Sequence, residues 1–303
     1  MEFIRPEINI DFVSRRRIAT IFSLVFIFLG MASLVLKGGP RYGIDFAGGT
    51  LVQVRFERMA DIGDIRSALD ERGMGSSIIQ SLGDNKVAIR VKSGVGEEDT
   101  VSDDISDILS ARFGEGGVSI DLVEMVGPQV GADMRRKGML SIVYAMVGIL
   151  IYITLRFQFR FALGAIAALI HDVLITIGVF SFFGKEFTLP VVAALLTIIG
   201  YSLNDTIVVY DRIRENTRRS PRDSLADIIN SSINQTLSRT ILTSGTTLLV
   251  VLCLFFLGGE VIHDFSFALL VGVVIGTYSS IYIASPILLL GQRSPNRKGS
   301  GRR

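Results

Sequence analysis

The stretch that decides the fold is FTLPVVAALLTIIGYSLNDTIVVY at residues 187–210, in which Asp205 is the only charged residue. A helix needs about 20 predominantly apolar residues to cross the hydrocarbon core of a bilayer, so this stretch predicts a transmembrane helix. A carboxylate inside such a helix costs about 2.5–3.5 kcal/mol on insertion scales. It persists where it has a partner, a water-filled cavity or a proton to carry, which makes Asp205 the first candidate functional residue.

The rest of the chain is also too apolar for an ordinary soluble protein. The 303 residues are 49% hydrophobic and the mean hydropathy is +0.48. The first apolar stretch follows Arg15, Arg16 and Arg17 and is too long for a typical signal peptide, so we interpret it as an uncleaved signal anchor. Six stretches are long enough to span a membrane: residues 18–36, 138–155, 161–184, 187–210, 240–259 and 265–292.

Lysine and arginine are unevenly distributed between the loops. They are concentrated in the N-terminal segment 1–17, in the loops after the second and fourth spans, and in the basic tail 293–303. Because cytoplasmic loops carry the excess of positive charge, both termini are predicted to be cytoplasmic. Residues 37–137 are then extracytoplasmic. The net charge of +2 gives no indication of a nucleic-acid partner.

The segment 37–137 has the length and the pattern of a folded domain. Alternating apolar residues predict strands, and amphipathic periodicity predicts helices. The predicted order is βαββαβ, which is typical of an α+β ferredoxin-like fold. The strands are expected at 49–56, 77–81, 86–91 and 118–126, and the helices at 61–72 and 97–113.

The loop after the fourth span predicts a further helix over about 221–237. Ser220 is its expected N-cap, followed by Pro221 at the first helical position. Its apolar face would lie on the membrane surface, dock against a partner or pack on its own bundle. Six spans with one loop domain suggest half of a twelve-span transporter, with the other half supplied by another chain.

Several polar or small residues inside the spans are candidates for function. Arg239, at the predicted mouth of the fifth span, is either a partner of Asp205 or an ordinary positive-inside anchor. His171 and Asp172, near the middle of the third span, form either a proton relay or a polar helix contact. Small residues at helical spacing, Gly272 and Gly276, predict close helix packing. We find no nucleotide-binding loop, zinc spacing or nucleophile motif, which argues against a hydrolytic enzyme.

Five segments together resemble the SecF proteins of the SecD/SecF family, which is related to the RND superfamily. They are GIDFAGGT (43–50), ALIHDVLITIGVFS (168–181), IIGYSLNDTIVVYDRIREN (198–216), SRTILTSGTT (238–247) and ALLVGVVIGTYSSIYIASP (268–286). The resemblance covers essentially residues 10–290. It implies a polytopic α-helical membrane protein of six spans, half of an RND-type twelve-helix bundle, with one ferredoxin-like extracytoplasmic domain.

The resemblance also implies a function. Such proteins pair with SecD and use the proton motive force to promote late-stage translocation of preproteins across the bacterial cytoplasmic (inner) membrane. Protons are the coupling ion and no cofactor is expected. The relay residues of the family fall on Asp205 and Arg239, with Asn204 and Asp211 in the same motif.

Further partners implied are the SecYEG channel, SecA, YajC, YidC, the translocating preprotein and membrane lipid, with no nucleic acid. Two alternatives stay open from the residues themselves. One is half of a small-molecule or lipid exporter of the RND type, and the other is a non-transporting scaffold of a membrane complex.

Overall fold

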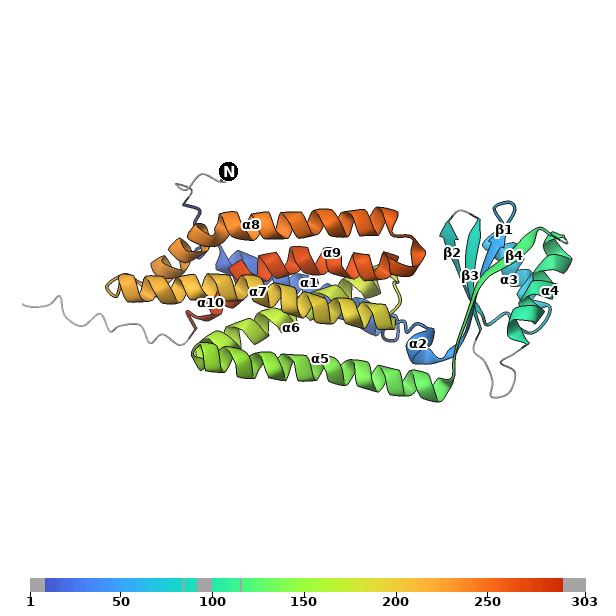
Figure 1. Cartoon of the computed structure of the whole chain (residues 1–303), viewed down its shortest axis with the longest axis horizontal. Coiled ribbons are helices and arrows are strands. Elements are labelled where there is room, and N and C mark those ends of the chain that lie inside the picture. Colours follow the sequence, from blue (N-terminus) through green and yellow to red (C-terminus); the bar gives the residue numbers. More distant parts are fainter. Residues whose placement is uncertain (1–8, 84, 92–99, 115, 291–303) are drawn as a thin grey trace, which may run out of the picture. The chain divides into compact units, whose positions relative to one another are not determined.

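The computed structural model describes residues 9–83, 85–91, 100–114 and 116–290, drawn in Figure 1 from blue at the N-terminal end to red. Six helices among these residues are long and apolar enough to cross a membrane, as predicted. In chain order they are α1 (Arg16–Leu36), α5 (Pro128–Arg156), α6 (Phe159–Phe183), α7 (Leu189–Arg219), α8 (Leu225–Leu257) and α9 (Glu260–Ser279). A short π-helix, η1 (Ser280–Ala284), and α10 (Ser285–Ile287) continue from α9.

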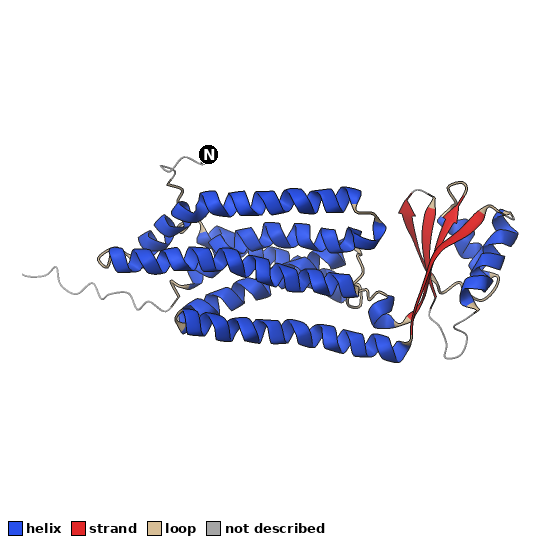
Figure 2. Ribbon diagram, viewed as in Figure 1, coloured by secondary structure: helices blue, strands red, loops and turns tan. Residues whose placement is uncertain are grey.

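The chain divides into two compact units, each described here by itself. The helical unit contains residues 1–39, 142–185 and 193–303, and the sheet unit contains residues 40–141 and 186–192. Figure 2 shows the same division by secondary structure, because all the strands belong to the sheet unit.

The helical unit has central and peripheral helices. In the most apolar window of each helix, 61% of α6 and 50% of α7 are buried, against 11% for α5 and for α8. Helices α1 and α6 approach closely at Gly30 and Gly178, where an added Cβ on Gly30 would lie 2.7 Å from the Gly178 Cα. Because lipid tails are apolar, the exposed leucine, isoleucine and phenylalanine side chains of α1, α5 and α8 are compatible with a bilayer.

Helix α8 differs from the prediction. The separate helix over 221–237 and the span 240–259 form one continuous helix, visible as the long α8 in Figure 1. No glycine or proline interrupts residues 225–244, so nothing breaks the backbone hydrogen bonds between them. The N-cap is Ser224, whose side chain accepts from the Asp227 N–H, and the predicted cap Ser220 lies before it in the turn.

The other helix boundaries extend beyond the predicted spans. Helix α5 begins at Pro128, where the missing N–H of proline costs nothing. Helix α7 continues past residue 210 through a polar segment, and α9 begins at Glu260 rather than 265. The predicted basic tail 293–303, the end of the sixth span and residues 97–99 lie outside the described residues.

The sheet unit confirms the predicted ferredoxin-like domain. Its strands pair antiparallel in the order β2-β3-β1-β4, and α3 and α4 connect them in the predicted βαββαβ sequence. Apolar residues of β1, β3, α3 and α4 form one core that includes Val52, Ile65, Ile89 and Ile105. The elements are α2 (Ile44–Ala47), β1 (Gly49–Phe56), α3 (Ile62–Asp70), β2 (Ile78–Gly83), β3 (Lys86–Val91), α4 (Val101–Phe113) and β4 (Val118–Val126).

The segment 186–192 belongs to the sheet unit although α7 begins within it. The Gly43 N–H donates to the Phe187 carbonyl at 2.8 Å, and Tyr42 forms an isolated parallel bridge with Phe187. Arg90 on β3 forms a bidentate ion pair with Glu186, and both side chains are largely buried. These contacts hold residues 186 and 187 within the sheet unit.

Candidate functional site

Asp205 lies in the middle of α7 and is buried, with 7% of its surface exposed. The Thr240 hydroxyl of α8 donates to its Oδ1 at 2.6 Å. The Ser280 hydroxyl, at the first residue of η1, donates to its Oδ2 at 2.5 Å. Hydrogen bonds to both oxygens favour a carboxylate, while removal from water opposes it. A group that exchanges a proton must not have one charge state strongly favoured over the other, and at Asp205 these two effects oppose each other.

Arg239 does not form an ion pair with Asp205 among the described residues. Its side chain is exposed, although it lies close enough to Asp205 for a Coulomb interaction. Consecutive residues of an α-helix point about 100° apart, so Thr240, which faces Asp205, turns Arg239 away from it. The residue of α8 that contacts Asp205 directly is therefore Thr240, and not the neighbouring Arg239.

The other two residues of the same motif lie outside this cluster. Asn204 is exposed. Asp211 is about half exposed, and its Oδ1 lies 3.5 Å from Arg156 Nη2 at the start of the α5–α6 turn. Neither side chain contacts Asp205 in the structure.

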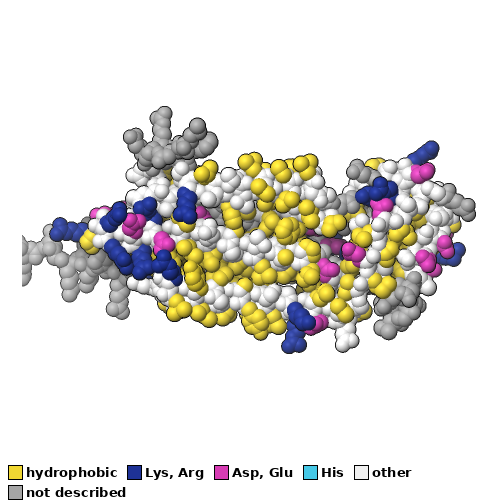
Figure 3. Space-filling view, viewed as in Figure 1, with side chains coloured by type: hydrophobic (Ala, Val, Ile, Leu, Met, Phe, Trp, Pro, Cys, Tyr) yellow, Lys and Arg dark blue, Asp and Glu magenta, His cyan; other side chains and the backbone are white. Residues whose placement is uncertain are grey.

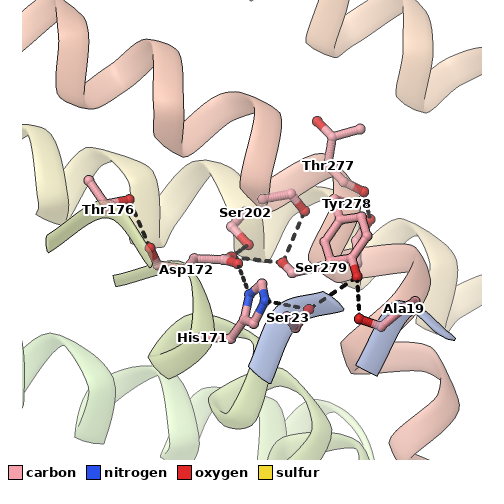
Figure 4. A network of polar contacts seen from close by, with 11 residues as sticks. Ala19, Ser23, His171, Asp172, Thr176, Ser202, Thr277, Tyr278 and Ser279 are labelled. Carbon is pink, nitrogen blue, oxygen red and sulfur yellow. Dashed lines mark hydrogen bonds and ion pairs between the residues drawn. The ribbon is translucent and has the colours of Figure 1, made fainter. Parts of the chain in front are cut away.

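His171 and Asp172 form a second buried cluster on α6, shown in Figure 4. The Asp172 Oδ2 accepts hydrogen bonds from Ser202 of α7 at 2.6 Å and from Ser279 of α9 at 2.8 Å. The Asp172 Oδ1 lies 2.9 Å from His171 Nδ1. Asp172, on α6, is thereby connected to α7 through Ser202 and to α9 through Ser279.

The network continues from His171 to α1. The His171 Nε2 lies 3.0 Å from the Ser23 hydroxyl, which lies 3.0 Å from the Tyr278 hydroxyl. Tyr278 donates to the Ala19 carbonyl at 2.7 Å, as Figure 4 also shows. Every member is hydrogen-bonded, which is the condition under which a buried polar network is stable.

The two carboxylates share their supporting elements. Ser279 and Ser280 are adjacent in the chain, and one binds Asp172 while the other binds Asp205. Ser202 and Asp205 are likewise one turn apart on α7. The change from α-helix to π-helix occurs between Ser279 and Ser280, and such π segments are frequent at functional sites.

Small residues let α7 and α9 approach closely beside the carboxylates. A Cβ added at Gly272 would lie 2.2 Å from the Ile198 Cγ1, and one at Gly276 would lie 3.0 Å from the Ser202 Cβ. The predicted packing residues therefore lie at the contact that brings Ser202 and Ser279 to Asp172. Nothing larger than glycine fits at position 272 without a shift of Ile198.

The sequence prediction included Asp205, His171 and Asp172 and missed the hydroxyl groups that hold them. These are Ser23, Ser202, Thr240, Tyr278, Ser279 and Ser280. The sequence marks each of these residues by a hydroxyl side chain inside an apolar span. Many residues of ordinary helix contacts have the same feature, so it did not single these out. Among the described residues, no group of three or more His, Cys, Asp or Glu side chains is placed to hold a metal ion.

Two family models match the chain. The model described as protein export membrane protein SecD/SecF, C-terminal, matches residues 109–294, and the SecD/SecF GG motif matches residues 34–58. The protein translocase subunit SecF of Magnetococcus marinus is 52% identical over 294 residues, covering 96% of this chain and 94% of that protein. The SecF proteins of Vibrio alginolyticus and Pseudomonas aeruginosa are 45% and 43% identical, and each alignment covers more than 90% of both chains.

A solved structure has the same fold. The crystal structure of SecDF, a translocon-associated membrane protein from Thermus thermophilus, is 36% identical and superposes with a TM-score of 0.86 over 95% of this chain. A second SecDF crystal structure, in a super-membrane-facing form, gives a TM-score of 0.69 at 38% identity. The present chain covers 39% of the length of each SecDF chain. On the family models and the near full-length SecF relatives, this chain belongs to the SecD/SecF family of protein-export membrane proteins.

Proposed function

We propose that this chain is the SecF subunit of the Sec protein-export machinery, and that with SecD it uses the proton motive force to promote late-stage preprotein translocation. The SecF relatives described above are named translocase subunits, which supports the export role. SecDF combines a SecD part and a SecF part in one longer chain, which supports SecD as the partner that completes the transmembrane helix bundle.

The observation that carries the proposal is the environment of Asp205. It is an ionisable side chain buried within a span, and its contacts are hydroxyl groups rather than a direct counter-ion. An intramembrane carboxylate in such a setting is typical of proton relays. Arg239, exposed but within electrostatic range, is the basic residue that would respond to its charge.

The hydrogen bonds suggest how protonation would be accommodated. A carboxylate accepts from both Thr240 and Ser280, whereas a protonated carboxyl must donate through one oxygen. Ser280 has a second acceptor, the Thr277 carbonyl at 3.0 Å, whereas Thr240 has none among the described residues. Ser280 is therefore the group that would turn when Asp205 takes a proton, and it begins the π-helix.

Orientation and the wider assembly are part of the same proposal. The positive-inside distribution supports cytoplasmic termini in a bacterial inner membrane, with the sheet unit on the far side. Contact with SecYEG, SecA, YajC, YidC and the preprotein would follow from the export role. The chain would have no hydrolytic activity, need no cofactor and use protons as its coupling ion.

The test is proton-dependent export by membranes that contain SecD and the variant chain. Asp205→Asn keeps one acceptor and removes the proton site, so the stimulation of preprotein export by a proton gradient should be lost. Copurification with SecD should be retained. Asp211→Asn is the matched control, since it removes a half-exposed carboxylate of the same helix. Export that still responds to the gradient in Asp205→Asn would overturn the relay role.

A further inference from the structure

A cavity opens at the end of the helical unit where α5 turns into α6. It has a volume of about 520 Å³. The α5–α6 turn and the adjoining parts of α7, α8 and α10 line it. Because α5 and α6 are each long and apolar enough to cross a membrane, the turn that joins them lies at a membrane surface.

The polar part of this cavity is strongly basic. Among the described residues, the cavity is lined by no aspartate or glutamate and by four arginines: Arg156, Arg160, Arg214 and Arg218. Figure 3 shows Lys and Arg side chains, in dark blue, gathered at the left end of the helical unit in that view. Arg156 Nη2 lies 3.5 Å from the Asp211 Oδ1, so this ion pair offsets part of the positive charge.

Most of the guanidinium donors are unused. Arg160 donates to the Leu288 and Leu290 carbonyls at 3.0 and 3.3 Å, and Arg214 donates to the Arg156 carbonyl at 3.4 Å. Arg218 makes no hydrogen bond or ion pair within the described part of the chain. Since each guanidinium carries five N–H donors, the four side chains can still bind an anion with several oxygens.

Apart from Gln158 and Thr217, the remaining lining residues are apolar. Three of them, Phe157, Ile213 and Leu288, are buried. Leu155, which also lines the cavity, is exposed on α5, and Phe159 is exposed at the start of α6. A ligand with an anionic headgroup and an apolar chain would contact both the arginines and the apolar side chains. A small soluble anion would contact only the arginines.

We propose that this cavity binds the headgroup of an anionic phospholipid. The phosphate lies against the arginines, and the acyl chains run along the exposed side chains of α5 and α6. Basic pockets between transmembrane helices are known to hold such headgroups. A zwitterionic lipid brings its own cation next to the guanidinium groups and binds less well. The site does not include Asp205, so the test of lipid binding does not depend on the proposed proton relay.

The test is lipid retention by the full chain, measured by native mass spectrometry from detergent with equal amounts of phosphatidylglycerol and phosphatidylcholine. The wild-type chain should retain phosphatidylglycerol preferentially. The double variant Arg214→Gln, Arg218→Gln should lose that preference by about tenfold or more, because it removes two charge-assisted donors. The control Arg219→Gln, Arg222→Gln removes the same charge from the end of α7 and the turn that follows it, outside the cavity lining, and should retain the preference.

One outcome of this experiment and two further measurements decide the proposal. Equal loss in both double variants would overturn the proposal, since it would show general attraction to a basic surface. Glycerol phosphate that displaces the lipid at equal concentration would assign the cavity to a soluble phosphate instead. Arg214→Lys, Arg218→Lys keeps the charge, and should keep a reduced preference for the anionic lipid. If the glutamine variant failed to fold, this lysine variant would carry the test, and a preference equal to that of wild type would count against bidentate phosphate contacts.

Discussion

Asp172 and Asp205 are two buried aspartates on neighbouring helices, and each accepts a hydrogen bond from one of two adjacent serines. Asp172 has a third partner, His171, and connects α6 to α7 and α9. Within the described part of the chain, Asp205 accepts hydrogen bonds only from the hydroxyls of Thr240 and Ser280. Residue type and burial are the same in the two places, so the difference lies in the partners.

That difference is the basis on which we propose the proton-relay role for Asp205 rather than for Asp172. His171 Nδ1 lies 2.9 Å from the Asp172 Oδ1 and its Nε2 lies 3.0 Å from the Ser23 hydroxyl, so Asp172 belongs to a network that reaches α1. Among the described residues, Asp205 has no cation within ion-pair distance. At each carboxylate one serine donor has a second acceptor, since Ser280 can turn to the Thr277 carbonyl and Ser279 to the Gly276 carbonyl. Asp205 therefore differs from Asp172 in having one hydrogen-bonding partner fewer, which supports the relay role that we propose for it.

The largest loss of stability is expected for Asp172→Ala. Ser202 Oγ and His171 Nδ1 would lose the only acceptor that the described residues give them. Each buried polar group left unpaired costs about 1–3 kcal/mol, so the loss should be about 2–6 kcal/mol. Values near the lower end are expected because polar groups within a bilayer find other partners. Equilibrium unfolding in mixed micelles measures it, and a loss below that of Asp205→Ala would contradict the comparison.

Asp205→Ala should cost about half as much. Only Thr240 would lose its acceptor, because Ser280 can turn to the Thr277 carbonyl, which gives a loss of about 1–3 kcal/mol. The same unfolding experiment measures it. Adding Thr240→Val should restore part of the loss, since it removes the unpaired hydroxyl. A double variant no more stable than Asp205→Ala would show that Thr240 finds a partner elsewhere.

Gly272→Ala tests the helix contact that both carboxylates share. The added methyl group would lie 2.2 Å from Ile198 Cγ1, so the side chain of Ile198 must move. Forcing an extra carbon into a packed contact costs about 1–3 kcal/mol, and the flexible end of Ile198 favours the lower value. Gly200→Ala on α7 is the control, because nothing lies within 4 Å of its added Cβ. Equal unfolding free energies in the two variants would exclude a tight α7–α9 contact.

The sequence was sufficient for the spans, for the order of the sheet domain and for Asp205, because each depends on local pattern. An apolar run of membrane length and a lone charge within it are visible in any such chain. The partners of Asp205 were not predictable in this way. Thr240 and Ser280 come from distant segments, and whether Thr240 or its neighbour Arg239 faces α7 depends on the rotation of α8. The single α8 was missed because its polar first half resembles a separate surface helix.

The smallest effect is expected at Asp121 on β4, a carboxylate with the opposite environment. It lies at the surface with 22% of its side chain exposed, and its hydrogen bond from Arg55, with Nη2 to Oδ2 at 2.8 Å, holds its pKa below the ordinary value of 3.8. The folded state therefore binds this proton less readily than the unfolded chain. The contribution of Asp121 to stability is present above the ordinary value and is lost as the pH falls through the lowered pKa.

Asp121→Asn should thus lower the unfolding midpoint of the full chain slightly at about pH 7, and the difference from wild type should vanish at a pH below the lowered pKa. Thermal unfolding at the two pH values measures it. Asp107→Asn, an exposed carboxylate of α4 without an ion pair in the described residues, is the control and should show no such trend. The effect stays small because solvent screens an exposed pair. A loss of stability in Asp121→Asn as large as that in Asp172→Ala would mean that the partners of a carboxylate, and not its burial, determine how much it stabilises this protein.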